Sequence, residues 1–279
     1  MKVSFFSSYS ANLNQGLPLR SILDNTGLGF RRNFEIATFD YLYEFRGLRY
    51  KSAISLLNQC EGKISSLSIE AYFEESVDDN DQDYGYENIL TLDNINMKPK
   101  NFYNLLKKGD HKATKKLLQK NDSFHLNSNV KTSQIINGYS GDDTFLMMGD
   151  SLSSARHELI GGKGKDFFEM NRSNDVITGG PQADTFYMKQ HQPGFWPEIT
   201  DFTKGKDRLI FDSIYLESPL FLSEYDGDTF IELHYVVDEE GDAATESVIR
   251  LNDTTDLVIE EQNIKLPGES KTNRFMVIS

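Results

Sequence analysis

The chain has 279 residues, a formal net charge of −14 at pH 7 and a single cysteine, Cys60. Its length allows one large hydrophobic core or two smaller ones. The excess of acidic residues makes nucleic acid and anionic membranes poor partners, and one cysteine cannot form an intramolecular disulfide. The apolar stretch after Met1 is too short for a signal peptide, and no later stretch is long enough to span a membrane.

Residues 1–120 predict a β-rich N-terminal domain that ends in two short helices. Apolar and polar residues alternate around Phe39–Phe45 and Ile64–Tyr72, as in half-buried strands, and Glu87–Ile95 predicts another strand. Pro99 is expected to begin the first helix, which Gly109 follows. The second helix is expected to follow directly, with residue 110 as its N-cap, and to end near residue 120.

Residues 138–187 contain a nine-residue repeat of glycine, aspartate and apolar positions. The segment Gly161–Glu169 matches every fixed position of the pattern G-G-x-G-x-D-x-U-x, in which U is apolar. Gly179–Tyr187 departs from the pattern only at its fourth position, where Gln182 replaces glycine. Gly138–Leu146 is another good copy. A ladder of copies in phase is a stronger signal than any single glycine-rich turn.

Two further copies are degenerate. Met170–Thr178 lies in register between the two best copies and keeps Asp175 at the aspartate position. Leu152–Ile160 has His157 at that position, and about five extra residues separate it from the copy before it, which predicts a bulging loop.

The spacing has a chemical reason. Glycines allow a tight turn whose carbonyl groups point to one place, the aspartate adds a charged oxygen, and the apolar residue anchors the next short strand. Calcium prefers six to eight oxygen ligands in a flexible cage, which such turns can provide. The repeat resembles that of the RTX, or haemolysin-type, calcium-binding proteins.

This resemblance implies a parallel β-roll in which calcium lies between turns on the same side, so that each repeat pairs with the next but one. Asp166 is then expected to pair with Asp184 and with Asp143. Asp175 would face His157, which is a poor ligand for a hard cation, so we expect about one to three calcium ions.

The segment Glu198–Phe211 resembles the I-x-D-F-x-x-G-x-D-x-I segment that closes RTX rolls, and its two acids are expected to complete a last calcium site. The candidate metal ligands are therefore Gly138, Gly141, Asp143, Gly161, Gly162, Gly164, Asp166, Asp175, Gly179, Gly180, Gln182, Asp184, Asp201 and Asp207. The aromatic pair Phe195 and Trp196 is expected to cover the open end of the roll.

Beyond the roll, Asp228–Val237 and Ser247–Leu251 predict a β-hairpin. This hairpin resembles the strands that cap RTX rolls. The final residues, Arg274–Ser279, resemble the uncleaved signals that type I exporters read, although a plain terminal strand explains them nearly as well. The expected fold is thus mainly β, with an N-terminal domain at 1–120, an RTX β-roll at 121–212, and capping strands with an export signal at 213–279.

Two functions fit these features. The favoured one is a non-enzymatic, calcium-binding protein that a type I exporter releases to the bacterial exterior or cell surface, where calcium folds the roll. The alternative is a polysaccharide-active or cell-surface adhesive protein whose N-terminal domain carries the activity and whose roll is a carrier. Acids and tyrosines such as Asp40, Glu44 and Tyr43 would then line a cleft, but a solvated strand face is the better explanation of them. No catalytic constellation stands out among five histidines and one cysteine.

Overall fold

The structure is a computed structural model, and it describes residues 1–5, 15, 17, 34–37, 41–49, 61–77, 81–126, 132–147, 155–170, 174–189, 196–212, 220–236, 243–267 and 269–279. The chain divides into two units, Met1–Ile135 and Ile136–Ser279. Neither of the described helices is long and apolar enough to cross a membrane.

The first unit contains a β-sheet with the strand order β6-β1-β5-β4-β3-β2. Neighbouring strands are antiparallel, except that β1 and β6 are parallel. Buried apolar residues such as Leu67, Ile69 and Leu92 form its core. The strands are β1 (Lys2–Phe5), β2 (Phe34–Ala37), β3 (Tyr41–Arg49), β4 (Glu61–Val77), β5 (Asp81–Met97) and β6 (Ser123–Leu126).

Two short helices follow β5. Helix α2 (Pro99–Leu106) begins at a proline, which can occupy the first turn because its missing N–H would have no partner there. Helix α3 (Asp110–Leu117) has Gly109 as its N-cap, at a φ of +89°, so the prediction that Asp110 is the N-cap was wrong by one residue. Asp110 instead lies in the first turn, where a negative charge is favourable.

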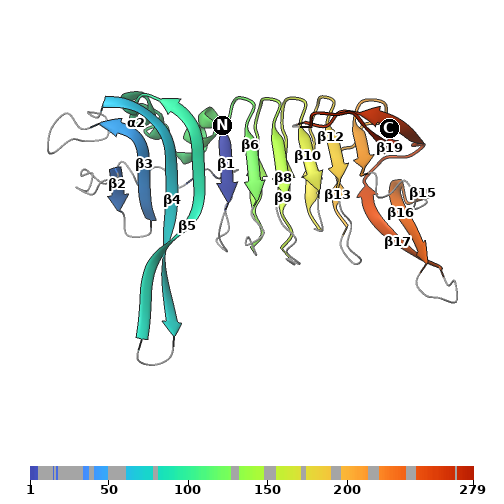
Figure 1. Cartoon of the computed structure of the whole chain (residues 1–279), viewed down its shortest axis with the longest axis horizontal. Coiled ribbons are helices and arrows are strands. Elements are labelled where there is room, and N and C mark those ends of the chain that lie inside the picture. Colours follow the sequence, from blue (N-terminus) through green and yellow to red (C-terminus); the bar gives the residue numbers. More distant parts are fainter. Residues whose placement is uncertain are drawn as a thin grey trace. The chain divides into compact units, whose positions relative to one another are not determined.

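The second unit is built around a parallel β-roll, in which successive strands alternate between two sheets (Figure 1). One sheet contains β8 (Thr144–Met147), β10 (Phe167–Met170), β12 (Thr185–Met188) and β14 (Arg208–Phe211). The other contains β7 (Ile135–Asn137), β9 (Glu158–Ile160), β11 (Val176–Thr178) and β13 (Glu198–Ile199). Phe167 pairs with Thr185, 18 residues later, and with Thr144, 23 residues earlier. The prediction of a mainly β chain with a parallel roll is confirmed.

The apolar position of the repeat fills the interior of the roll. Phe145, Phe168 and Phe186 are each 0% exposed and stack on one another, with ring centroids 4.6 Å and 5.3 Å apart. Phe202 continues the column at 6.1 Å from Phe186. Leu159, Ile177 and Ile199 lie at the equivalent buried positions of the second sheet. The coils of β8, β10 and β12 therefore each add a buried phenylalanine from the first sheet, whereas Leu209 occupies that position in β14.

Strands cover the last edge of each sheet of the roll. Strand β17 (Ala243–Leu251) adds in parallel to β13, and β16 (Asp228–Val236) and β15 (Leu220–Tyr225) follow it as antiparallel strands. Strand β19 (Asn273–Ile278) pairs antiparallel with β14 and with β18 (Ile259–Ile264). The structure thus contains the predicted hairpin, and residues 274–278 belong to a strand.

The expected aromatic cover of the roll is not seen at Trp196. This side chain is 48% exposed, and Phe195 lies outside the described residues. Added strands satisfy the unpaired backbone groups of an edge directly, which an aromatic side chain cannot do.

Candidate metal centre

Four stacked turns connect the second sheet to the first, and they carry the repeat's glycines and aspartates. We call them the glycine turns: residues 138–143, 161–166, 179–184 and 201–207. The aspartates that end them are buried, with exposed fractions of 1–2%. They are Asp143, Asp166, Asp184 and Asp207.

These four aspartates form a ladder along the roll. Oδ1 of Asp166 accepts a hydrogen bond of 2.8 Å from the backbone N–H of Asp143. Oδ1 of Asp184 accepts one from the N–H of Asp166, and Oδ1 of Asp207 accepts one from the N–H of Asp184. The carboxylates of Asp166, Asp184 and Asp207 therefore each fix their own turn against the preceding coil.

The second carboxylate oxygen faces a glycine. Oδ2 of Asp166 and Oδ2 of Asp184 are buried and have no hydrogen-bond partner among the described residues. A Cβ placed on Gly161 would lie within 3.0 Å of Asp166 Oδ2 and 2.6 Å from the carbonyl oxygen of Gly179. A Cβ on Gly179 would lie 2.5 Å from Asp184 Oδ2. Only glycine therefore permits this convergence of carboxylate and carbonyl oxygens.

The other glycines of the turns bring backbone against backbone. Gly162, Gly164 and Gly180 have φ values of +96°, +140° and +115°, which side chains disfavour. A Cβ on Gly162 would lie 2.6 Å from the carbonyl oxygen of Tyr139, and one on Gly164 would overlap that of Gly141. Carbonyl oxygens of one turn are thus held directly against the next turn.

Burial of the ladder disfavours its negative charges. Desolvation raises the pKa of Asp166 to about 6. It raises that of Asp184 to about 7, with further contributions from the charges of Asp166, Asp207 and Asp201. The pKa of Asp207 is also raised, chiefly by burial. A cation beside these carboxylates would offset both the cost of burying them and the repulsion between them.

The remaining predicted residues have different positions. The Gln182 side chain accepts a hydrogen bond of 3.0 Å from the N–H of Gly164. Both carboxylate oxygens of Asp201 accept hydrogen bonds of 2.8 Å, from the N–H groups of Gly179 and Gly180. Asp201 therefore binds the first two residues of the preceding glycine turn, whereas Asp207 continues the ladder. Gly138 repeats the Gly161 environment. A Cβ placed on Gly138 would lie close to the Asp143 carboxylate and 2.7 Å from the Gly161 carbonyl oxygen.

Asp175 lies apart from the ladder, on the turns that connect the first sheet back to the second. Its Oδ1 accepts a hydrogen bond of 2.9 Å from the N–H of His157, one coil earlier. Burial lowers the pKa of His157, and the charge of Asp175 partly opposes this. The segment 171–175 between β10 and β11, which carries Asp175, contains no glycine that could bring carbonyl oxygens together.

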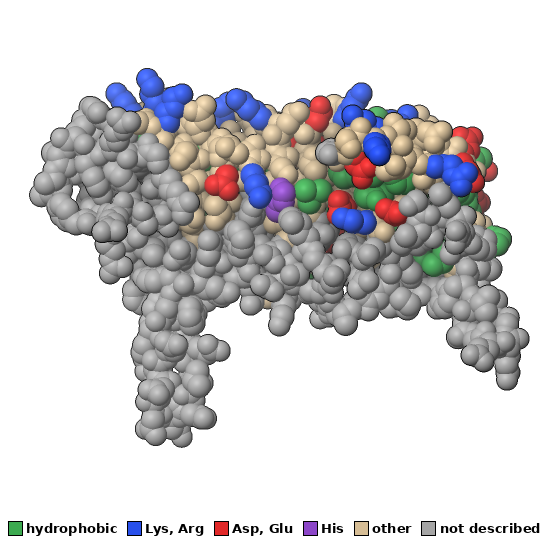
Figure 2. Space-filling model, in the orientation of Figure 1, with side chains coloured by type: hydrophobic (Ala, Val, Ile, Leu, Met, Phe, Trp, Pro, Cys, Tyr) green, Lys and Arg blue, Asp and Glu red, His purple; other side chains and the backbone are tan. Residues whose placement is uncertain are grey.

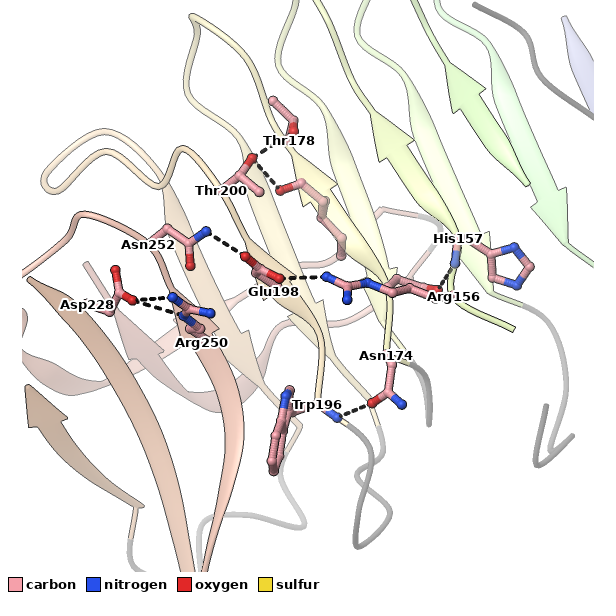
Figure 3. Close-up of polar contacts among 12 residues, drawn as sticks. Arg156, His157, Asn174, Thr178, Trp196, Glu198, Thr200, Asp228, Arg250 and Asn252 are labelled. Carbon is pink, nitrogen blue, oxygen red and sulfur yellow. Dashed lines mark hydrogen bonds and ion pairs between the residues drawn. The ribbon is translucent and has the colours of Figure 1, made fainter. Parts of the chain in front are cut away.

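The outer face of the second sheet carries polar contacts that the sequence did not predict (Figure 3). Glu198 accepts hydrogen bonds of 2.7 Å from Arg156 and from Asn252, so it connects β13 to the coil before it and to β17. Arg250 forms an ion pair of 2.6 Å with Asp228 within the cap. The repeat pattern gives no signal for these partners, because they come from separate segments.

A cation at the glycine turns would need backbone oxygens. Among the described residues, no group of three or more histidine, cysteine or acidic side chains is placed to hold a metal ion. Each glycine turn offers one buried carboxylate and several carbonyl oxygens, which is a hard, all-oxygen ligand set. Calcium accepts such sets, whereas zinc prefers nitrogen and sulfur.

Comparison with known proteins found similarity only at the level of structure. No protein-family model matches the chain, and a search of curated proteins found no match. Among solved structures, the chain is similar to the solution structure of the AlgE6R3 subunit from the Azotobacter vinelandii mannuronan C5-epimerase. The sequence identity is 21% and the TM-score 0.23, with 48% of this chain and 71% of that chain covered.

The raised pKa of Asp184 predicts that the metal-free protein loses stability as the pH rises. Below pH 3.8 this carboxyl is protonated in both states, but up to about pH 7 the unfolded chain ionises first, so folding is progressively disfavoured. In chelator, Asp184→Asn should therefore equal the wild type at about pH 4 and retain more β structure than the wild type above about pH 7. Far-UV circular dichroism across this range measures the difference.

The matched control is Asp226→Asn, which removes the same charge from an exposed turn. Its β signal in chelator should show no comparable pH-dependent gain over the wild type. Parallel pH profiles for Asp184→Asn and the wild type would contradict the expected burial of an ionised Asp184.

Proposed function

We propose that the chain is an exported calcium-binding protein of the RTX type, without enzymatic activity, whose β-roll folds when calcium binds outside the cell. The ladder residues Asp143, Asp166, Asp184 and Asp207 would supply the charged ligands. The glycine turns would supply carbonyl oxygens. When bound, calcium would neutralise the ladder and join adjacent coils.

The observation that carries this proposal is the convergence at Gly161 and Gly179. Each glycine faces a buried carboxylate oxygen, Asp166 Oδ2 or Asp184 Oδ2, and Gly161 also faces a carbonyl oxygen. Burying a carboxylate oxygen without a partner is costly, and burying an ionised one is more so. A hard cation bound at this place would offset that cost.

The charge of the chain supports a role for calcium in folding. A net charge of −14 opposes compaction, and the buried aspartates add a local penalty to it. At low cytosolic calcium the roll would remain loose and suited to export through a type I exporter. At millimolar external calcium the turns would fill, because metal binding that requires the folded site stabilises the fold.

The alternative, a polysaccharide-active or adhesive function of the N-terminal unit, depends on Asp40, Glu44 and the neighbouring tyrosines. Their side chains lie outside the described residues. No described contact favours that alternative over the calcium-binding function.

Calcium-dependent folding is tested by far-UV circular dichroism of the purified chain. In chelator, addition of calcium should increase the β signal, and magnesium at the same concentration should not, because it demands a smaller octahedral site. Asp166→Ala should need a higher calcium concentration for the same change. A chain that is fully folded in chelator and unchanged by calcium would overturn the proposal.

A further inference from the structure

The second unit has a cavity of about 400 Å³ on the outer face of its first sheet. Its floor comes from β10, β12 and β14, and the segment that connects β18 to β19 forms its wall. The apolar part of the lining includes Phe167, Ile210 and Leu266. Figure 2 shows one face of this unit, on which apolar side chains reach the surface between basic and acidic ones.

Four basic side chains surround this cavity, which we call the basic pocket. They are Lys165, Lys206, Arg208 and Lys265. Lys206 donates a hydrogen bond to the carbonyl oxygen of Pro181. Among the described residues, none of the four forms an ion pair. In a chain of net charge −14, a group of basic side chains around one cavity is unexpected, because they repel one another while acidic partners are abundant.

Two acids also line the basic pocket, but they do not neutralise it. Asp166 and Asp184 are 2% and 1% exposed, respectively. Their Oδ1 atoms accept backbone hydrogen bonds within the ladder, and their Oδ2 atoms face the glycines of the turns. The groups that a ligand would meet at the mouth are therefore the exposed side chains of Lys165, Arg208 and Lys265.

The neighbouring cavity gives a comparison within the same unit. It has a volume of about 280 Å³ and shares Phe167, Leu266 and Pro267 with the basic pocket. Its one basic side chain, Lys189, forms an ion pair of 2.9 Å with Glu169. Unpaired positive charge is thus concentrated in the basic pocket rather than spread along this face.

We propose that the basic pocket binds an organic polyanion, a molecule with an apolar body and two or more carboxylate, sulfonate or phosphate groups. Lys165 lies two residues before β10, and Arg208 is the first residue of β14, with β12 between these strands. Strands in a sheet are about 4.8 Å apart and rise about 3.3 Å per residue, so the backbone positions of Lys165 and Arg208 are separated by roughly 12 Å. The anionic groups of the ligand would meet the side chains that extend from these positions, and its apolar body would lie against Phe167, Ile210 and Leu266. A cavity of this volume is in the range of small-molecule sites.

Isothermal titration calorimetry in excess calcium tests this proposal. The first probe is 2,6-naphthalenedisulfonate, whose sulfonates compete weakly for calcium, and the second is 2,6-naphthalenedicarboxylate, which has the same apolar body but carries carboxylates instead. We expect one site for at least one probe. The triple variant Lys165→Gln, Arg208→Gln and Lys265→Gln should weaken that binding at least about tenfold, since it removes three charged contacts.

The matched control removes the same charge elsewhere, with Lys100→Gln, Lys108→Gln and Lys112→Gln in the first unit, where all three lysines are exposed. It should change the affinity by less than about twofold, as expected for screened charges at a distance. Binding of only one probe would assign the anionic group that the pocket prefers. Absence of binding by both probes, or equal losses in the two triple variants, would overturn the proposal. A failure of this proposal in either of these two ways would not bear on calcium binding by the glycine turns.

Discussion

Replacement of Phe168 by alanine should lower the free energy of unfolding of the calcium-loaded protein by about 3–5 kcal/mol. Phe168 is 0% exposed and lies in the middle of the aromatic column, stacked between Phe145 and Phe186. Its loss would leave a cavity that backbone pairing on both sides prevents from collapsing, because β10 is held by β8 and β12. Urea unfolding monitored by circular dichroism measures the change.

Phe221→Ala is the matched control for this substitution. Phe221 is 44% exposed on β15, so the same truncation there should change the unfolding free energy by less than about 1 kcal/mol. If the two variants lost similar stability, the column of stacked rings would not be the core of the roll.

Gly164→Ala should destabilise the calcium-loaded roll by roughly 3 kcal/mol or more. Its φ is +140°, a conformation that residues with a side chain rarely adopt, and its Cβ would overlap the carbonyl oxygen of Gly141 in the preceding turn. That carbonyl belongs to backbone, so neither turn can move without disrupting the stacking of coils. The same unfolding experiment applies, together with a calcium titration of the variant.

Gly205→Ala separates backbone conformation from close approach. Gly205 also has a positive φ, of +73°, but a Cβ there would have no neighbour within 4 Å. Its replacement should cost only about 1–2 kcal/mol, the strain of a left-handed residue. Equal losses at Gly164 and Gly205 would show that contact between turns is unimportant.

The repeat pattern predicted the roll because its physical requirements are local. A glycine pair, an aspartate and an apolar residue at fixed spacing specify one turn and one short strand, and copies in phase stack those units. The column of Phe145, Phe168 and Phe186 follows directly from the apolar position of three copies. The helix after Pro99 could be predicted for a similar reason, since its start signal lies in the adjacent sequence.

Other features could not be predicted from the sequence because they bring distant segments of the chain together. Nothing near Trp196 indicates that β17 would cover β13 in its place. The basic pocket needs Lys265 from the β18–β19 connection beside Lys165 and Arg208 from the roll. Asp201 and Asp207 looked equivalent in the sequence, yet only Asp207 continues the ladder, because Asp201 begins its turn beside Gly179 and Asp207 ends the turn beside Asp184.

Calcium binding by the aspartate ladder is tested most directly by equilibrium dialysis at neutral pH, with Asp166→Asn and Asp226→Asn beside the wild type. The wild type should bind about one to three ions, and Asp166→Asn should lose one ion or bind about tenfold more weakly, because it removes the charged ligand but keeps an acceptor for Asp143 N–H. Asp226→Asn, at an exposed turn, should bind as the wild type does. Absence of calcium binding by the wild type, or unchanged binding by Asp166→Asn, would contradict the account.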